Sequence, residues 1–181
     1  MNLIHASTLR IGLAATVLCL ILCGILYNEN RLAREGIPAT LSVEGFDPRD
    51  ILSGNYVELS FFSEQNIAPK CYGETYLGLK RERGKALVIG DFPSPEAVRK
   101  AGLIGTIGSC QFDKQDEKAN PPYKVRVMLP ISRFYANAET ALALEKALQD
   151  PQTQAIAEIS LGSDGKARLR ALIVNGKRYP A

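Results

Sequence analysis

The sequence predicts an α+β, strand-rich fold: a mostly antiparallel sheet or open barrel-like domain with one or two helices, preceded by a single N-terminal transmembrane helix. Three features predict it. An uncharged apolar run opens the chain, segments of alternating apolar and polar residues follow it, and a hairpin pattern ends it. Of the 181 residues, 46% are hydrophobic and 23% are charged, which is typical of a folded protein rather than a disordered one.

The first expected element is a membrane anchor. Residues 11–28 contain no charged side chain, and nine of them are Leu, Ile or Val. At about 1.5 Å per residue, a helix of this length covers about 27 Å, close to the thickness of the hydrocarbon layer. Arg10 followed by an apolar run also fits a signal peptide, but Leu22 is a poor flank for cleavage. We therefore expect an uncleaved transmembrane anchor at residues 10–28, after a short cytoplasmic leader at residues 1–9.

The charges around this helix hardly decide its orientation, because Arg10 precedes the apolar run while Arg31 and Arg34 follow it closely. The short leader offers little to translocate, whereas a long C-terminal domain can cross a membrane largely regardless of its charge. We therefore expect a protein of a bacterial-type inner membrane with its N-terminus in the cytoplasm. A juxtamembrane stalk at residues 29–37 would then lead to a periplasmic domain at residues 38–181.

Strand-like segments fill most of the expected domain. The clearest is residues 56–62, where Val57, Leu59 and Phe61 alternate with more polar residues, as in a half-buried strand. Segments rich in Gly and Pro separate further strands. These further strands are expected at residues 39–43, 74–80, 86–90, 102–112 and 123–129. Within residues 102–112, glycines spaced by three indicate a bent or closely approached strand rather than a phosphate-binding loop.

Two helices and a hairpin complete the expected domain. A short helix is expected to begin at Pro95, and a longer one covers residues 138–149 with Asn137 as its N-terminal cap. Residues 155–161 and 166–174 flank a Gly-Ser-Asp-Gly turn and therefore predict an antiparallel hairpin.

Residues that carry chemistry are scarce. The only histidine is His5, which precedes the expected membrane helix, so Ser-His-Asp and Cys-His sites are excluded from the outer domain. We expect no metal site and no cofactor, because the domain's cysteines have no histidine to join and no paired spacing. The balance of 22 Lys and Arg against 19 Asp and Glu gives little attraction to nucleic acid. The sequence does not indicate an oligomeric state.

The four cysteines fall into two groups. In an oxidising periplasm, Cys71 and Cys110 could form a disulfide that stabilises the fold by about 3 to 4 kcal/mol in the chain-entropy model. The alternative is that both are small buried hydrophobic residues. Cys19 and Cys23 lie in the expected anchor, where apolar filler is the favoured interpretation.

Residues 47–61 read Asp-Pro-Arg-Asp-Ile-Leu-Ser-Gly-Asn-Tyr-Val-Glu-Leu-Ser-Phe and resemble the GDYXXLXY family of bacterial membrane-anchored proteins. The resemblance continues beyond that stretch. An aromatic pair and two later glutamates of the family are similar to residues 134–145, and a strand, Asp-Gly and strand ending is similar to residues 155–179. Asn55 replaces the Asp of the family name and Phe61 its final Tyr, which are mild changes for a turn and for aromatic bulk.

The resemblance implies a one-helix anchor and an extracytoplasmic domain of unknown biochemical activity, which acts beside a multi-pass membrane protein. Our first hypothesis is therefore a non-enzymatic accessory or interaction module. The alternatives are an envelope ligand-binding domain and a hydrolase that uses a Ser/Lys pair or acidic residues. Candidate binding residues, for which a structural corner is the alternative, are those of the family-like segments: Asp47, Arg49, Asp50, Gly54, Tyr56, Leu59, Tyr135 and Glu139.

Overall fold

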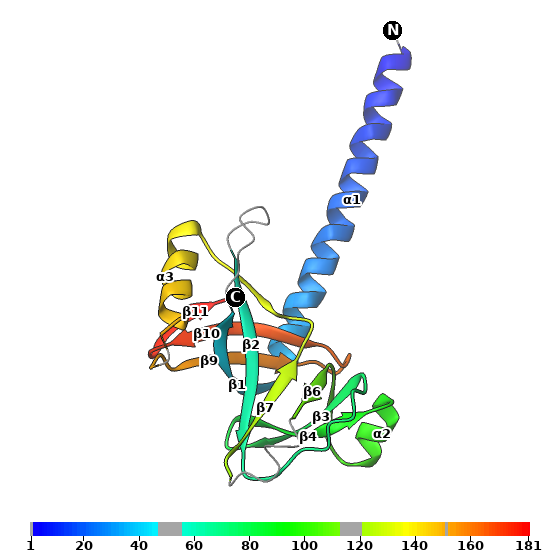
Figure 1. The fold of residues 1–181 in the computed structure, drawn as a ribbon. Coiled ribbons are helices and arrows are strands. Elements are labelled where there is room, and N and C mark those ends of the chain that lie inside the picture. Colours follow the sequence, from blue (N-terminus) through cyan, green and yellow to red (C-terminus); the bar gives the residue numbers. More distant parts are fainter. Residues whose placement is uncertain (1, 47–55, 113–120, 151) are drawn as a thin grey trace.

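The computed structural model describes residues 2–46, 56–112, 121–150 and 152–181, and within the first of these ranges it describes the side chains of residues 12–44. One long helix projects from a strand-rich body, so the N-terminus lies far from the rest of the chain (Figure 1). The C-terminal strands lie in the body, beside the first strand that follows the helix.

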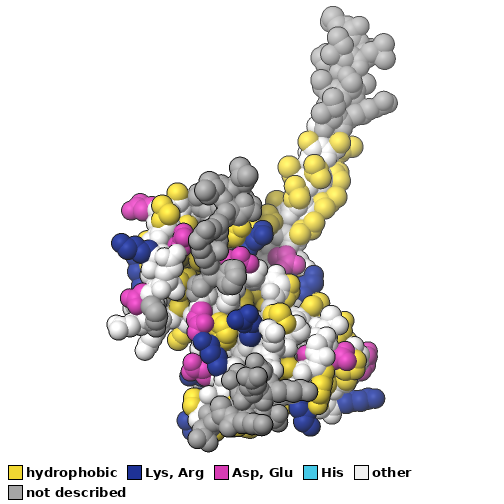
Figure 2. Space-filling model, in the orientation of Figure 1, with side chains coloured by type: hydrophobic (Ala, Val, Ile, Leu, Met, Phe, Trp, Pro, Cys, Tyr) yellow, Lys and Arg dark blue, Asp and Glu magenta, His cyan; other side chains and the backbone are white. Residues whose placement is uncertain are grey.

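Helix α1 spans Asn2–Glu35 and is longer than the sequence predicted. The expected stalk is helical up to Glu35, where an Arg31–Glu35 ion pair of 2.9 Å links successive turns. Among the described residues, one helical stretch is long and apolar enough to cross a membrane, Gly12–Glu35, and none of its most apolar stretch is buried against the body. Its hydrophobic side chains form the yellow surface of the projecting helix in Figure 2.

The body is one open sheet. The strands along its main path run in the order β11-β10-β9-β1-β2-β7-β6, and each neighbouring pair is antiparallel. Their bounds are β1 (Ile37–Phe46), β2 (Tyr56–Gln65), β6 (Ser109–Gln111), β7 (Tyr123–Met128), β9 (Ala155–Leu161), β10 (Ala167–Val174) and β11 (Lys177–Pro180). The C-terminal hairpin and a further turn into β11 therefore build one side of the sheet.

Four more strands attach to this path. They are β3 (Tyr76–Glu82), β4 (Lys85–Phe92), β5 (Ile104–Ile107) and β8 (Arg133–Tyr135). β4 meets β1 in parallel at the Thr40–Lys85 pair, which makes the described sheet mixed. The strand-rich α+β fold is confirmed. The strand predicted at residues 102–112 is divided into β5 and β6 at Gly108, whose φ of 154° and approach to the Met128 carbonyl exclude a side chain.

Both helices of the body form at the predicted places. Helix α2 (Pro95–Lys100) is capped by the Ser94 hydroxyl, which accepts a hydrogen bond from the Ala97 amide at 3.2 Å. Helix α3 (Ala138–Leu148) is capped by the Asn137 side chain, which accepts from the Thr140 amide at 2.8 Å. The inward face of α3 buries Ala141, Leu144 and Leu148 in the core.

The buried face of strand β2 extends beyond its apolar residues. Val57, Leu59 and Phe61 lie in the core as expected, and Ser63 and Gln65 continue the same alternation and are buried as well. The Ser63 hydroxyl donates to the Ala86 carbonyl at 3.0 Å. The Gln65 side chain accepts from the Val88 amide at 2.8 Å and donates to the Val88 carbonyl at 2.7 Å. These polar side chains are buried because they link β2 to the backbone of β4.

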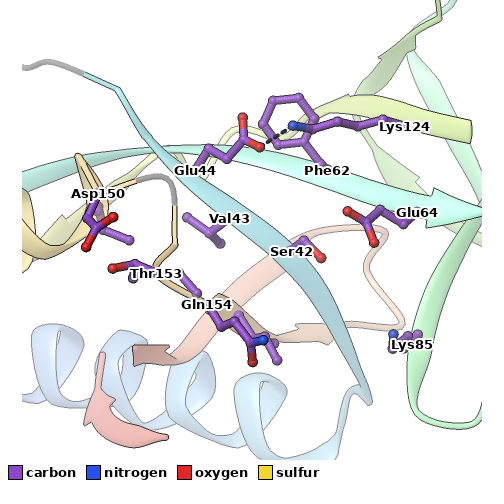
Figure 3. A pocket seen from close by; sticks show the side chains of 13 residues that line it. Ser42, Val43, Glu44, Phe62, Glu64, Lys85, Lys124, Asp150, Thr153 and Gln154 are labelled. Atoms are coloured by element: carbon purple, nitrogen blue, oxygen red, sulfur yellow. Dashed lines mark hydrogen bonds and ion pairs between the residues drawn. The ribbon is translucent and has the colours of Figure 1, made fainter. Parts of the chain in front are cut away.

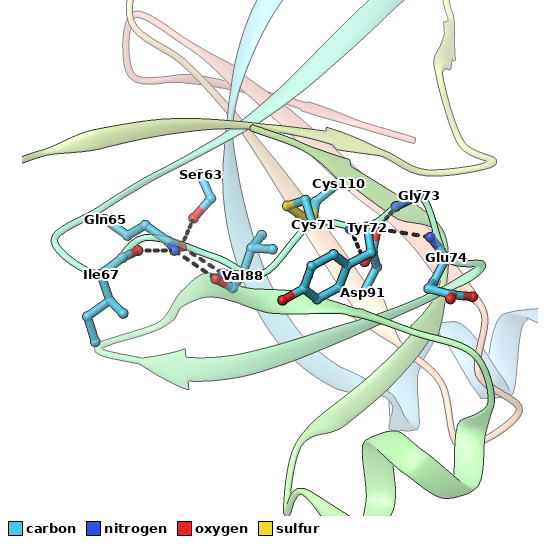
Figure 4. The surroundings of a disulfide bond; sticks show 10 residues. All are labelled: Ser63, Gln65, Ile67, Cys71, Tyr72, Gly73, Glu74, Val88, Asp91 and Cys110. Atoms are coloured by element: carbon cyan, nitrogen blue, oxygen red, sulfur yellow. Dashed lines mark hydrogen bonds between the residues drawn. A yellow bond between two sulfur atoms is a disulfide. The ribbon is translucent and has the colours of Figure 1, made fainter. Parts of the chain in front are cut away.

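A disulfide between Cys71 and Cys110 connects the loop before β3 to β6, with Cα atoms 5.4 Å apart. Beside it, the buried Asp91 carboxylate accepts hydrogen bonds from three successive backbone amides. The donors are Tyr72 at 2.6 Å, Gly73 at 2.9 Å and Glu74 at 3.1 Å (Figure 4). An irregular loop is thus held both by a covalent bond and by one carboxylate.

Gly36, which joins α1 to β1, provides a test of how closely the helix packs on the body. A Cβ there would overlap the hydroxyl of Ser160 and lie 3.0 Å from the Leu161 carbonyl oxygen. We expect Gly36→Ala to lower the free energy of unfolding of the full chain in detergent by about 1 to 3 kcal/mol. Ser160→Ala should leave the free energy of unfolding unchanged or raise it, because the buried Ser160 hydroxyl has no hydrogen-bond partner among the described residues.

Urea unfolding of both single variants and of the double variant measures these effects. The double variant should recover part of the loss, since the first overlap is with the Ser160 hydroxyl. Wild-type stability in Gly36→Ala would contradict the close packing at this joint.

Candidate functional site

The family-like candidate residues divide into two groups. Asp47, Arg49, Asp50 and Gly54, together with the turn predicted around them, lie outside the described residues. Their segment joins β1 to β2, whose described ends are paired through Phe46 and Glu58. Tyr56, Leu59, Tyr135 and Glu139 are described, and the structure brings two of these four together.

Tyr56 and Tyr135 are partners in neighbouring strands, because the short strand β8 pairs antiparallel with the start of β2. Their ring centroids are 5.9 Å apart with a tilted arrangement. The Arg133 guanidinium lies 4.7 Å from the centroid of the Tyr56 ring, and hydrogen bonding to Tyr135 raises the pKa of Arg133. We call Tyr56, Arg133 and Tyr135 the tyrosine–arginine cluster. Tyr56 is buried, while Tyr135 and Arg133 face solvent.

The positions of Leu59 and Glu139 are explained by the fold itself. Leu59 is a core residue, and its amide donates to the Ser132 carbonyl at 2.7 Å, which aligns β8 on β2. Glu139 is exposed in the first turn of α3, where a carboxylate favours the helix dipole. The sequence did not indicate Arg133, since a charged residue in a three-residue strand has no periodicity to reveal its role.

A second feature is a hollow on the outer face of the sheet, with a volume of about 710 Å³, which we call the sheet hollow. Phe62 forms part of its lining, and Lys124 Nζ lies 4.4 Å from the centroid of that ring. Lys124 also pairs with Glu44 across the strands (Figure 3). Glu64, Lys85 and Asp150 add charges of both signs around it.

The chemistry of these two features is that of binding. Tyr and Arg are enriched among the residues that dominate protein interfaces, and the tyrosine–arginine cluster presents both. The sheet hollow combines an aromatic ring with paired charges, which suits a ligand carrying both polar and apolar groups. Within the described part of the chain, no three His, Cys, Asp or Glu side chains are grouped to hold a metal ion.

A third feature fixes α1 to the body. Arg168 of β10 donates to Glu29 of α1 at 2.8 Å and also pairs with Asp164 of the β9–β10 turn at 2.8 Å. We call these three residues the helix tie. The side chain of Arg168 is only 12% exposed, but Glu29 is 52% and Asp164 29% exposed, so water partly screens the tie. The tie holds α1 to the body at Glu29, and the packing at Gly36 holds the chain directly after the helix.

The tie should make the free energy of unfolding depend on pH in the acid range. Hydrogen bonding to Arg168 lowers the pKa of Asp164 from 3.8 to about 2. A carboxyl whose pKa is depressed by folding contributes stability above its unfolded pKa and loses it as the pH falls toward its folded pKa. We therefore expect Asp164→Asn to remove about 1 kcal/mol at neutral pH and almost nothing near pH 2, with allowance for its partial exposure.

Urea unfolding of the full chain in detergent, from neutral pH down to about pH 2, measures this difference. Lys80→Gln, which removes an exposed charge on β3 away from the tie, serves as the control. A stability difference between Asp164→Asn and wild type that stays constant across the range would contradict the pairing.

Comparison with known proteins gives one match. A family model described as GDYXXLXY protein matches residues 18–172, which include the second half of α1 and nearly all of the body. No curated protein and no solved structure matches the chain.

Proposed function

The chain belongs to the GDYXXLXY family, and we propose that it is a membrane-anchored, non-enzymatic accessory module of the bacterial envelope. Its helix spans the inner membrane, its N-terminus is cytoplasmic, and its periplasmic domain binds a multi-pass membrane protein. The observation that carries the proposal is the direct joint between α1 and the body, which the helix tie reinforces. The proposed boundaries are a leader at residues 1–9, an anchor at 10–28, a stalk at 29–37 and the domain at 38–181.

Membrane insertion follows from the surface of α1. Nine apolar residues that each favour insertion by roughly 0.3 to 0.6 kcal/mol give about 3 to 5 kcal/mol in favour of the bilayer. The body leaves these side chains uncovered, so the bilayer is the environment that removes them from water.

The direct connection between α1 and β1 at Gly36 is the reason for proposing a partner in the same membrane. A receptor for a diffusing ligand works at any angle to the bilayer, so a flexible tether would be enough for it. A helix that continues to Glu35 and enters β1 through a single glycine instead supports one orientation of the domain. Fixed orientation and confinement to one membrane both raise the effective concentration for a neighbouring membrane protein.

The tyrosine–arginine cluster supplies the contact surface in this proposal. Tyr135 is 65% exposed although it is a large aromatic residue next to an arginine. Leu142 on α3 is 67% exposed and lies outside the cluster. Truncation of a tyrosine that dominates an interface to alanine costs about 2 kcal/mol or more, roughly thirtyfold in affinity, and we expect Tyr135 to be such a residue.

The test is affinity purification of the tagged full chain from its native membrane in mild detergent, followed by mass spectrometry. Wild type and Leu142→Ala should recover one stoichiometric multi-pass protein, which Tyr135→Ala and a chain without residues 1–36 should lose. The proposal fails if no membrane protein is enriched with wild type, or if Tyr135→Ala recovers it as well as Leu142→Ala does.

The sheet hollow favours a second candidate, the binding of an envelope ligand. Lys124 and Arg126 both lie over the Phe62 ring, at 4.4 and 5.6 Å from its centroid, and frame an apolar floor with positive charge. Under this alternative, Phe62→Ala would abolish ligand binding while Tyr135→Ala would have no effect.

A further inference from the structure

A separate crevice lies at the foot of α1, between the end of that helix, α2, β5 and the β9–β10 turn. Its volume is about 770 Å³. We call it the helix crevice. Most of its exposed lining is apolar, with Leu32 and Ile37 from the end of α1 and the start of β1, and Leu103, Ile104 and Ile107 from the segment after α2. Figure 2 shows hydrophobic side chains both along α1 and on the body below its foot.

Among the described residues that line the crevice, Arg99 is the cation without a strong partner. Both acidic residues of the crevice already pair with an arginine. Glu35 pairs with Arg31 at 2.9 Å, and Asp164 pairs with Arg168 at 2.8 Å. Arg99 lies 4.0 Å from Glu96 on the same short helix, and both of those side chains are largely exposed, so that pair is weak. An apolar hollow with an underused arginine at its edge suits an amphipathic anion.

The position of the crevice indicates where such a molecule would come from. Leu32 lies five residues after Tyr27, the last large apolar residue of the uncharged run, which is about 7 to 8 Å along a helix. The polar headgroup layer on each side of a bilayer is about 5 to 8 Å thick. With α1 inserted, the upper edge of the crevice therefore lies at the outer limit of the lipid headgroups, and the rest of the crevice lies beyond it (Figure 1).

We propose that the helix crevice binds an anionic phospholipid drawn from the adjoining leaflet, with part of an acyl chain outside the bilayer against Leu103, Ile104 and Ile107 and the phosphate near Arg99. This inference rests on the membrane insertion of α1 in the proposed function and does not depend on the protein partner. The bound lipid would fill apolar surface that the body leaves uncovered and would further fix the domain at the bilayer surface.

The test uses the purified full chain in vesicles of phosphatidylcholine with or without phosphatidylglycerol, each containing a trace of phosphatidylglycerol with a photoactivatable acyl chain. Mass spectrometry then maps the cross-links. Ile107→Glu places a charge in the crevice, and Ile156→Glu is a matched control on the outer face of β9, since the two isoleucines are 36% and 38% exposed. Arg99→Ala tests the phosphate contact.

Cross-links to residues 95–107 should appear in wild type and in Ile156→Glu, and fall about tenfold in Ile107→Glu. These cross-links should also fall in Arg99→Ala. In wild type they should fall when excess unlabelled phosphatidylglycerol is added, and they should not fall when phosphatidylcholine is added instead. Cross-links to α1 report insertion independently and should persist in every variant. The inference is overturned if only α1 is labelled, or if Ile107→Glu and Ile156→Glu are labelled alike. Loss of α1 labelling as well would instead contradict the membrane insertion itself.

Discussion

Replacing Cys71 and Cys110 together with alanine should lower the free energy of unfolding by about 3 to 4 kcal/mol, the largest single effect that we expect. The disulfide spans a sequence separation of 39 residues, so its loss frees a long loop in the unfolded chain. It also joins the loop before β3 to β6 beside the core, where Cys110 is buried.

Urea unfolding of the full chain in detergent, without reductant, measures this loss. Replacing Cys19 and Cys23 with serine is the matched control, because both are exposed on α1 and neither is bonded. That control should match wild type in the midpoint of domain unfolding. A double alanine variant within about 1 kcal/mol of wild type would show that the loop does not depend on the bond.

Asp91→Ala should cost about 2 to 4 kcal/mol, because it leaves three backbone amides without their acceptor in a largely buried place. The carboxylate is 5% exposed and serves Tyr72, Gly73 and Glu74 at once. Asp91→Asn keeps one acceptor oxygen and should lose less than Asp91→Ala does. Equal stability of the two variants would mean that the amides find other partners.

These two effects should not add. Asp91 and the disulfide hold consecutive residues of one loop, so either loss loosens the segment that the other restrains (Figure 4). We therefore expect the triple variant to lose less than the sum of the separate losses. The same unfolding series measures the difference, and strict additivity would contradict a shared loop.

The elements that the sequence predicts correctly are those that are stabilised by residues close to them in the chain. The N-terminal caps Ser94 and Asn137 each satisfy an amide within their own helix, and the C-terminal hairpin is set by its turn. The alternation of Val57, Leu59 and Phe61 likewise predicts their burial correctly.

The features that escaped prediction depend on distant parts of the chain. Strand β8 has only three residues and exists because Ser132 and its neighbours pair with β2. Ser63 and Gln65 lie on the buried face of β2, but their polar partners could not be predicted, because the backbone groups of β4 that they bond lie 23 residues further along the chain. The helix tie was equally hidden from the sequence, since Arg168 lies 139 residues from Glu29.

The candidate site shows the same division. Sequence reasoning selected Tyr56 and Tyr135 from two separate family-like segments, and the pairing of β2 with β8 brings their rings together. It could not select Arg133, which gains its role only through that pairing. It also treated Leu59 as a binding candidate, whereas the structure places that side chain in the core.

The most direct test of the account is the distance between α1 and the body in a lipid bilayer. Spin labels at Leu20→Cys on α1 and Leu142→Cys on α3, with Cys19 and Cys23 replaced by serine, allow pulsed electron paramagnetic resonance on the full chain in nanodiscs. All of these side chains are exposed, so labelling should not disturb the fold. A Gly-Ser insertion after Gly36 combined with Arg168→Ala is the flexible control. The account predicts one narrow distance distribution for the native joint and a broad one for the control, and equally broad distributions for both would contradict it.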